Sequence, residues 1–122
     1  MIVWLNGPFG SGKTTLAAGL CRAVPGATVA DPEAVGDLLR SALARHALRP
    51  RDYQNLPPWR QMTGAFVVAL TRHTGGPVIV PMTVLHPAYA EEIFTPLRQA
   101  GGFHHLVVHI HPAALQERIE AS

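Results

Sequence analysis

The first fifteen residues constrain the fold more strongly than any other part of the chain. An apolar run at residues 2–5 (IVWL) leads directly into GPFGSGKT at residues 7–14. This octapeptide has the spacing G-x-x-x-x-G-K-[ST] of the phosphate-binding P-loop, or Walker A motif. An amphipathic segment at residues 13–24 follows it. A buried strand, a glycine-rich loop and a helix are therefore predicted in succession, and this context disfavours the alternative of a strand–turn–helix without a ligand.

The residue types in this loop each have a physical task in binding phosphates. Glycines allow backbone conformations that other residues avoid, and they let backbone N–H groups approach an anion closely. The following helix directs its dipole and its unpaired N–H groups at the same place. We expect Lys13 to reach the β- and γ-phosphates and the hydroxyl of Thr14 to bind Mg²⁺. The expected ATP-binding residues are Gly7, Pro8, Phe9, Gly10, Ser11, Gly12, Lys13, Thr14 and Thr15.

Composition indicates one globular domain. The chain has 122 residues, a hydrophobic content of 48% and a net charge of +2. Its arginines are scattered, so the pI near 9.2 indicates a nucleic-acid partner only weakly. Cys21 is the only cysteine, which excludes an internal disulfide. No apolar run approaches the roughly 20 residues of a membrane span, and the N-terminus lacks the pattern of a signal peptide, so we expect a cytoplasmic protein.

Helix-like and strand-like segments alternate along the chain, which predicts an α/β fold with a parallel sheet covered on both faces. In such folds the ligand binds at the carboxyl ends of the strands. Those ends are expected at Asn6-Gly7, Asp31, Met82-Thr83 and His111. Pro96 is expected to kink or divide the helix that contains it. The expected strands span residues 2–5, 27–30, 77–82 and 105–110, and the expected helices span residues 13–24, 32–46, 59–73, 87–100 and 112–122.

Acidic residues follow the second predicted strand, in the segment Asp31-Pro32-Glu33. A carboxylate at Asp31 would face the γ-phosphate, where it could accept a proton from a substrate hydroxyl or hold Mg²⁺ through water. The same three residues also form a normal helix start, with Asp31 as the N-cap. The two interpretations are compatible. Glu33 is a weaker candidate for the same task.

Other candidates for substrate binding follow later in the chain. Arg60, at the start of the third predicted helix, suits a polar or anionic substrate, although a solvated arginine beside a packed tryptophan explains it equally well. Thr83 and His86 follow the third strand and could contact the acceptor or the phosphates, but His86 also suits the start of a helix. Tyr53 and Gln54 could line the same pocket.

Metal binding is expected only at the P-loop. His109 and His111 share a face of the fourth predicted strand, close to His104 and His105. This group has no cysteine or acidic partner at a familiar spacing, so we do not expect a metal site there. No acidic residue ends the third strand, where many P-loop NTPases have a second magnesium ligand. Mg²⁺ would then depend on Thr14, the phosphates and water, with help from Asp31.

Six segments of the chain together carry a family resemblance. They are residues 2–7, 9–14, 31–33, 58–60 and 79–83, and the segment that contains His86, Pro87 and Tyr89. They resemble the tunicamycin-resistance ATP-binding proteins of bacteria, and the resemblance runs along the whole chain. The P-loop identifies only the superfamily, whereas the segments after residue 79 are more specific. More distantly, the layout is similar to small-molecule kinases such as shikimate kinase and chloramphenicol phosphotransferase.

This resemblance implies a three-layer P-loop NTPase fold with parallel strands in the order 2-3-1-4-5, and one kinase-like domain over residues 1–122. It also implies ATP and Mg²⁺ as cofactors, Asp31 as base or acceptor-binding group, and Arg60 near the acceptor. The kinases continue into a lid with arginines, a fifth strand and an adenine-binding loop. Arg118 could be a first lid arginine, but no segment suits the fifth strand. We therefore expect the domain to be incomplete at its C-terminus or completed by a partner.

The sequence predicts a phosphotransferase that uses Mg-ATP and acts on a hydroxyl of a small molecule, and the resemblance implies resistance to a tunicamycin-type antibiotic as its specific form. We expect Lys13 and Asp31 to be catalytic, Asp31, Arg60, Thr83 and His86 to bind substrate, and Thr14 to bind Mg²⁺. One alternative is a protein that sequesters a drug with ATP but without turnover, and another is a kinase of nucleotide metabolism. No nucleic-acid partner is expected. Peripheral membrane association and the choice between ATP and GTP stay open.

Overall fold

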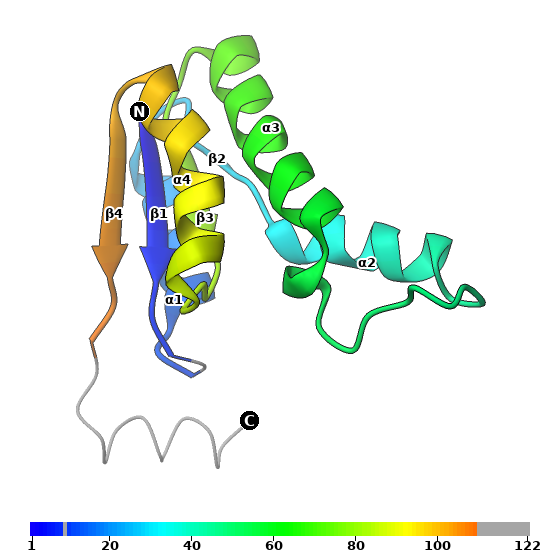
Figure 1. Cartoon of the computed structure of the whole chain (residues 1–122). Coiled ribbons are helices and arrows are strands. Elements are labelled where there is room, and N and C mark those ends of the chain that lie inside the picture. Colours follow the sequence, from blue (N-terminus) through cyan, green and yellow to red (C-terminus); the bar gives the residue numbers. More distant parts are fainter. Residues whose placement is uncertain (9, 110–122) are drawn as a thin grey trace.

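The computed structural model of the chain describes residues 1–8 and 10–109. Its central feature is a four-stranded sheet in the order β2-β3-β1-β4, in which all neighbouring strands are parallel (Figure 1). The order confirms the predicted 2-3-1-4 arrangement and with it the α/β P-loop fold class. The strands are β1 (Ile2–Asn6), β2 (Thr28–Val29), β3 (Val78–Pro81) and β4 (Phe103–Val107).

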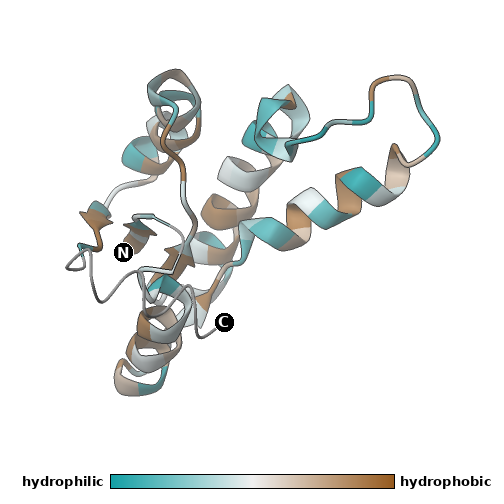
Figure 2. Ribbon diagram, turned by 90° about the horizontal axis from the view of Figure 1, so that it is seen from below, coloured by the Kyte–Doolittle hydropathy of each residue, from teal (hydrophilic) through white to brown (hydrophobic). Residues whose placement is uncertain are grey.

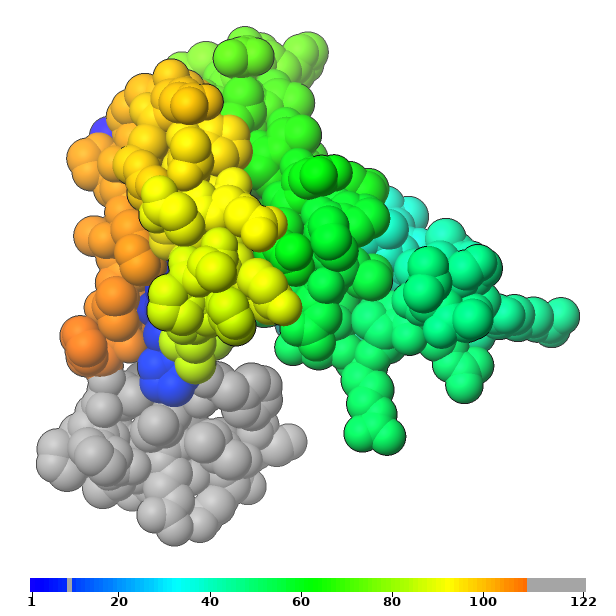
Figure 3. Space-filling model, in the orientation of Figure 1, coloured from blue at the N-terminus to red at the C-terminus, as the bar shows by residue number. Residues whose placement is uncertain are grey.

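Helices connect the strands, as the alternating sequence pattern predicts. α1 (Lys13–Ala23) joins β1 to β2, and α4 (Pro87–Ala100) joins β3 to β4. The longer connection from β2 to β3 contains α2 (Pro32–Ala42), the short 3₁₀ helix η1 (Tyr53–Asn55) and α3 (Pro57–Thr74). Figure 3 shows α4 between β4 and α3, while the segment after α2 projects from the body of the molecule.

Alternate residues of the strands divide the core between the two faces of the sheet. The smaller cluster joins Leu5 of β1 and Ile79 of β3 to Ala17 of α1. Figure 2 shows the hydrophobic colour of the central strands. Both faces of β1 and β3 are covered, as predicted for the sheet, whereas β4 is largely exposed. The larger cluster joins the other side of β1 and β3 to α3 and α4, and its fully buried members include Trp4, Trp59, Val67, Ile93 and Leu97.

Several element boundaries differ from those predicted, most of them by one or two residues, and the largest differences are at α2 and β4. α2 ends at Ala42 rather than at residue 46, because the backbone then closes short turns in which the N–H of His46 donates to the carbonyl of Leu43. β4 begins at Phe103 rather than at residue 105, because Phe103 already pairs with Ile2 in the parallel ladder. Pairing with a neighbouring strand is not visible in the local sequence, so these boundaries were the least predictable part of the fold.

The proline in α4 does not divide the helix, which was one of the two effects that the sequence analysis expected of it. α4 is continuous over Pro87–Ala100 with Pro96 inside it. Pro96 packs closely against α3, since a β-carbon built on Gly64 would lie 3.3 Å from Cγ of Pro96. Tertiary packing between the two helices therefore stabilises a residue that costs free energy within a helix.

Some predicted features lie outside the described residues. These are Phe9, His111, Arg118 and the helix expected at residues 112–122. Within residues 1–8 and 10–109, no helix has the length and apolar character needed to cross a membrane.

Candidate functional site

The loop between β1 and α1 has the backbone conformation that its glycines predict. Gly7, Gly10 and Gly12 have φ angles of 146°, 79° and 89°. Gly12 is the N-cap of α1 in the left-handed region, which side chains with a β-carbon rarely adopt. Glycines therefore supply the positive φ angles by which the loop reaches the start of α1, as in a phosphate-binding loop.

The N-terminus of α1 differs from that of α2. In the part of the chain that the structure describes, no side chain caps α1 and its first turn has no acidic residue. In contrast, Asp31 caps α2, with its Oδ1 accepting a hydrogen bond of 2.9 Å from the N–H of Glu33. A helix N-terminus without a capping carboxylate is suited to bind an external anion.

Lys13 lies over the loop that precedes it. Its Nζ donates hydrogen bonds to the carbonyl of Pro8 at 3.0 Å and to Oγ of Ser11 at 3.4 Å. Burial lowers the pKa of Lys13, and the nearby charge of Glu33 partly opposes this shift by raising it. The ammonium group is therefore held at the loop and is electrostatically coupled to a carboxylate from α2.

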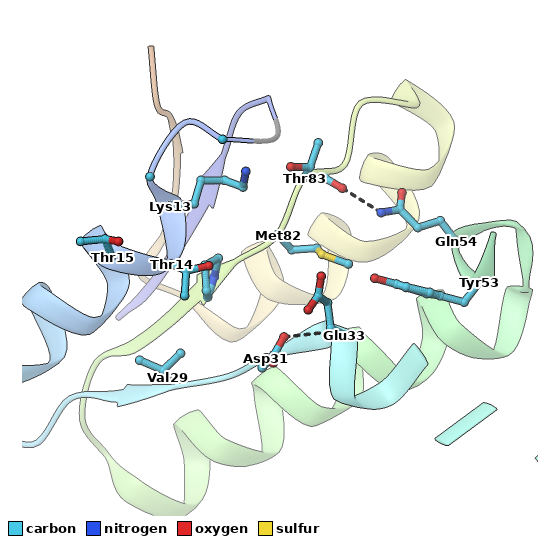
Figure 4. Close-up of a pocket in the computed structure, with 13 residues that line it drawn as sticks. Lys13, Thr14, Thr15, Val29, Asp31, Glu33, Tyr53, Gln54, Met82 and Thr83 are labelled. Atoms are coloured by element: carbon cyan, nitrogen blue, oxygen red, sulfur yellow. Dashed lines mark hydrogen bonds between the residues drawn. The ribbon is translucent and has the colours of Figure 1, made fainter. Parts of the chain in front are cut away.

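One cavity of about 590 Å³ brings the loop and this carboxylate together (Figure 4). We call the part formed by the loop and α1 the phosphate side and the part formed by β2, α2, η1 and β3 the acceptor side. The phosphate side is lined by Gly10, Gly12, Lys13, Thr14 and Thr15, and the acceptor side by Val29, Asp31, Glu33, Tyr53, Gln54, Pro81, Met82 and Thr83.

The two carboxylates enter the acceptor side from the start of α2. In Figure 4, the side chain of Glu33 extends toward Met82 and Tyr53, and Asp31 lies beside it with the capping hydrogen bond drawn as a dashed line. Because Asp31 caps α2, the orientation of its carboxylate is fixed. The arrangement places acidic oxygens opposite the N-terminus of α1.

Tyr53 forms the wall of the acceptor side next to Glu33. Its ring makes an edge contact with Trp59, with the centroids 5.1 Å apart, and the guanidinium of Arg40 lies 4.7 Å from its centroid. Burial, with the charge of Glu33, raises the pKa of Tyr53 to about 12. The hydroxyl is therefore protonated at neutral pH and can donate a hydrogen bond.

A series of hydrogen bonds links this wall to the P-loop. The carbonyl of Gln54 accepts from Nη1 of Arg60 at 2.7 Å, and Nε2 of Gln54 donates to the carbonyl of Thr83 at 2.8 Å. Oγ1 of Thr83 in turn donates to the carbonyl of Gly7 at 2.6 Å. Gln54 and Thr83 thus connect the acceptor side to the first glycine of the loop, a role that the sequence analysis did not assign to them.

Asn6 makes a second connection that the sequence analysis missed. It is 5% exposed, and its Oδ1 accepts from the N–H of Gly7 at 2.9 Å and of Val84 at 3.0 Å. Its Nδ2 donates to the carbonyl of Val84 at 2.8 Å. A polar residue at the end of a buried apolar run is a signal that could have found it, because a buried amide must be hydrogen-bonded.

Arg60 and His86 do not line this cavity. The guanidinium of Arg60 is buried, and its Nε lies 2.6 Å from Oε2 of Glu92 on α4. Its ring neighbour is Tyr89, with 4.1 Å between Cζ and the ring centroid. His86 is exposed and stacks on the same ring at 4.0 Å. The structure therefore separates both residues from the other predicted substrate-binding residues.

The histidines near β4 form no metal site within the described residues. No group of three or more histidine, cysteine, aspartate or glutamate side chains could hold a metal ion in residues 1–8 and 10–109. Burial lowers the pKa of His105, and its Nε2 lies 3.2 Å from Nδ2 of Asn6. This histidine belongs to the surroundings of Asn6.

Comparison with known proteins identifies the family. The family model described as "AAA domain" matches residues 2–121. The chain belongs to that family. A structure of the tunicamycin resistance protein of Deinococcus radiodurans aligns with a TM-score of 0.82 at 31% identity, over 98% of this chain and 68% of that one. This confirms the resemblance to the tunicamycin-resistance ATP-binding proteins, and the P-loop kinase-like AAA fold implies nucleotide binding.

More distant structures share the fold. A sugar kinase from a Janibacter species has a TM-score of 0.72 at 20% identity, over 99% of this chain and 66% of that one. A chain of the Pnkp1/Rnl/Hen1 RNA repair complex aligns with a TM-score of 0.71 at 20% identity, and the alignment covers 98% of this chain and 36% of the chain from that complex. Among curated protein sequences, none matches. The chain thus spans about two thirds of the length of the first two structural relatives.

The contact between α2 and Tyr53 predicts the effect of Gly36→Ala. The new β-carbon would lie 2.5 Å from the Tyr53 ring, so the ring must move. We expect the free energy of unfolding to fall by about 1–3 kcal/mol in chemical denaturation. Gly19→Ala in α1 is the control, because its β-carbon meets nothing within 4 Å. The free energy of unfolding of that variant should rise by about 0.5–1 kcal/mol. Equal changes in the free energy of unfolding of the two variants would contradict the contact between Gly36 and Tyr53.

The hydrogen bond from Thr83 to Gly7 predicts the effect of Thr83→Val. One hydrogen bond is worth about 0.5–1.5 kcal/mol, so the affinity for a fluorescent nucleoside triphosphate should fall by about two- to tenfold. Thr71→Val is the control, since its hydroxyl donates to the carbonyl of Val67 within α3 at 2.9 Å. A loss of nucleotide affinity as large in Thr71→Val as in Thr83→Val would show that the bond to Gly7 has no special part.

Proposed function

We propose that this chain binds ATP through residues 7–15 and transfers the γ-phosphoryl group to a hydroxyl of a small molecule on the acceptor side. The observation that carries this proposal is the shared cavity, with the uncapped N-terminus of α1 and Lys13 on one side and two carboxylates on the other. Phosphoryl transfer requires such a pairing of a positive cradle with a group that can accept the proton of the acceptor hydroxyl.

The phosphate side would stabilise the charge of the transferred group. Backbone N–H groups at the start of α1 and the ammonium of Lys13 are donors that need little reorganisation, because the loop already fixes them. Thr14 and Thr15 line the same side and extend it along the first turn of the helix. These groups bind the β- and γ-phosphates in the proposed complex.

Asp31 would orient the acceptor hydroxyl and take its proton. Its cap on α2 holds the carboxylate at the edge of the cavity, and the side chain is exposed rather than buried in the core. A carboxylate in this position can accept a hydrogen bond from a hydroxyl.

The residues present fit a magnesium ion. The hydroxyl of Thr14 and the carboxylate of Asp31 both line the cavity, and hard oxygen ligands are those that Mg²⁺ prefers. We assign Thr14 as its protein ligand, with Asp31 acting through water. A bound Mg²⁺ would neutralise part of the charge on the phosphates.

An antibiotic of the tunicamycin type is the proposed acceptor or ligand. The support is the 31% identity to the Deinococcus radiodurans tunicamycin resistance protein over 98% of this chain. Sequestration of the drug without turnover is the competing function, since resistance requires only that the drug is removed. The chain covers 68% of that relative, so the activity of a longer protein is part of the proposal.

Mass spectrometry separates these functions. The protein is incubated with Mg-ATP and with tunicamycin or other hydroxyl-bearing antibiotics and metabolites. A phosphate added to one compound would identify a kinase and its acceptor. ATP-dependent binding of tunicamycin without a change in mass would instead identify sequestration. If the protein showed no phosphate transfer and no drug binding, both forms of the proposal would be contradicted.

Lys13→Ala should weaken nucleotide binding. The variant removes the ammonium that lies over the loop, and we expect the Kd for ATP to rise by about tenfold or more with the fold retained. Isothermal titration measures the Kd, and circular dichroism measures the fold. Arg22→Ala, in the last turn of the same helix, is the control. Unchanged ATP affinity in folded Lys13→Ala would remove Lys13 from the proposed site.

Asp31→Asn should abolish transfer and spare the fold. Asparagine caps a helix as well as aspartate does, so α2 is preserved while the basic oxygen is lost. For any acceptor that the wild type phosphorylates, the rate should fall by about 100-fold or more. Asp37→Asn, an exposed position on α2, should change little. Full activity in Asp31→Asn would exclude Asp31 from the mechanism.

A further inference from the structure

The charged groups of the cavity are divided unequally between its two sides. The acceptor side carries the carboxylates of Asp31 and Glu33, and in the described lining it has no cationic side chain. Lys13 is the cation of this lining, and it belongs to the phosphate side, where it is hydrogen-bonded to Pro8 and Ser11. A molecule on the acceptor side therefore meets a negatively charged surface.

The arginines close to the acceptor side have other partners. Arg40 stands over the ring of Tyr53 and lies 3.9 Å from Asp37 on the same helix. Arg60 is paired with Glu92 and donates to the carbonyl of Gln54. Neither guanidinium lines the cavity. The bidentate cation that usually holds a carboxylate or phosphate of a substrate is thus absent from the described lining.

The pKa of Tyr53 is raised mainly by burial, and the carboxylates of the acceptor side add to this rise. Among the charges, that of Glu33 raises the pKa most, and those of Asp52 and Asp31 raise it further. Arg40 lowers it, but without reversing the shift. Because an anion in the cavity would feel the same carboxylates, it would be repelled as the ionised tyrosine is.

We propose that the acceptor side selects hydroxyl-bearing molecules that are uncharged or cationic and rejects those with an anionic group. This proposal rests on the proposed function and narrows its substrate class. Glu33 is the residue that sets the preference, because its side chain extends into the cavity toward Met82 and Tyr53 (Figure 4). Its carboxylate accepts a hydrogen bond from a hydroxyl or ammonium group of the acceptor, and the protonated hydroxyl of Tyr53 donates one.

A thiol placed in the cavity measures this preference without nucleotide or turnover. Val29 is 40% exposed and lines the acceptor side, so Val29→Cys gives an accessible thiol there. Cys21→Ala removes the native thiol. Two methanethiosulfonate reagents, one with a trimethylammonium group and one with a sulfonate group, then modify the protein. The same thiolate attacks the sulfenyl sulfur of either reagent and displaces methanesulfinate, so its pKa cancels from the ratio of the two rates.

Ser41→Cys, also in the Cys21→Ala background, is the matched control at the exposed end of α2. We expect the ratio of cationic to anionic rates to be about tenfold higher for Val29→Cys than for Ser41→Cys at low salt. Glu33→Gln, an isosteric change added to the Val29→Cys protein, should remove most of this difference between the two rate ratios. High salt should also reduce the difference. Equal ratios at the two positions, or no effect of Glu33→Gln, would overturn the proposal.

The outcome is distinguishable from failure of the proposed function. A high ratio with no phosphoryl transfer would support the charge preference and count against the kinase. Phosphorylation of an acceptor that carries a carboxylate, sulfate or phosphate would overturn the charge preference and leave the kinase in place. An uncharged or cationic acceptor would support both.

Discussion

The geometry of the site depends on one buried side chain, that of Asn6 at the end of β1. Its amide pairs with the backbone of Gly7 and of Val84, so the start of the P-loop and the segment after β3 are fixed to each other. β1 and β3 are parallel neighbours, which brings both segments to the same edge of the sheet. A backbone path that broke these hydrogen bonds would leave buried polar groups unpaired at a cost of about 1–3 kcal/mol each. The loop therefore has little freedom where it leaves the sheet.

The acceptor side is joined to this fixed point through side chains rather than through the sheet. Glu92 pairs with Arg60, Arg60 holds the carbonyl of Gln54, and Gln54 holds Thr83, which bonds to Gly7. Each bond links a different element, from α4 through α3 and η1 to the loops after β3 and β1. Because the guanidinium of Arg60 is buried while Glu92 is exposed, removing the carboxylate of Glu92 would leave a buried cation without its ion-pair partner. Arg60 thus acts on the cavity by positioning its wall, and not by lining it.

The P-loop and the acidic start of α2 could be predicted because each is encoded within a short stretch of sequence, whereas the strand order was implied by the family resemblance. The apolar run at residues 2–5 indicates a buried strand, the glycines that follow indicate a phosphate-binding loop, and Asp31-Pro32-Glu33 indicates the start of a helix. The pairing of Arg60 could not be predicted, since its partner Glu92 lies on α4, whereas His86 stands at the helix start that the sequence offered as its alternative role. The continuity of α4 through Pro96 could not be predicted either, since that helix continues through contact with α3. A free arginine and a buried, paired one look identical in sequence, and only tertiary structure distinguishes them.

The two helix N-termini at the cavity explain why the carboxylates lie where they do. Had Asp31 or Glu33 occupied the first turn of α1, their oxygens would bond to its N–H groups and reduce its positive potential, as Asp31 does at α2. Their place at the start of the neighbouring helix keeps them within the same cavity but away from those N–H groups. The N-terminus of α1 then stays suited to phosphate, while the opposite side keeps oxygens that can accept hydrogen bonds. This separation lets one small domain present an anion-binding surface and a proton-accepting surface to two ligands that meet between them.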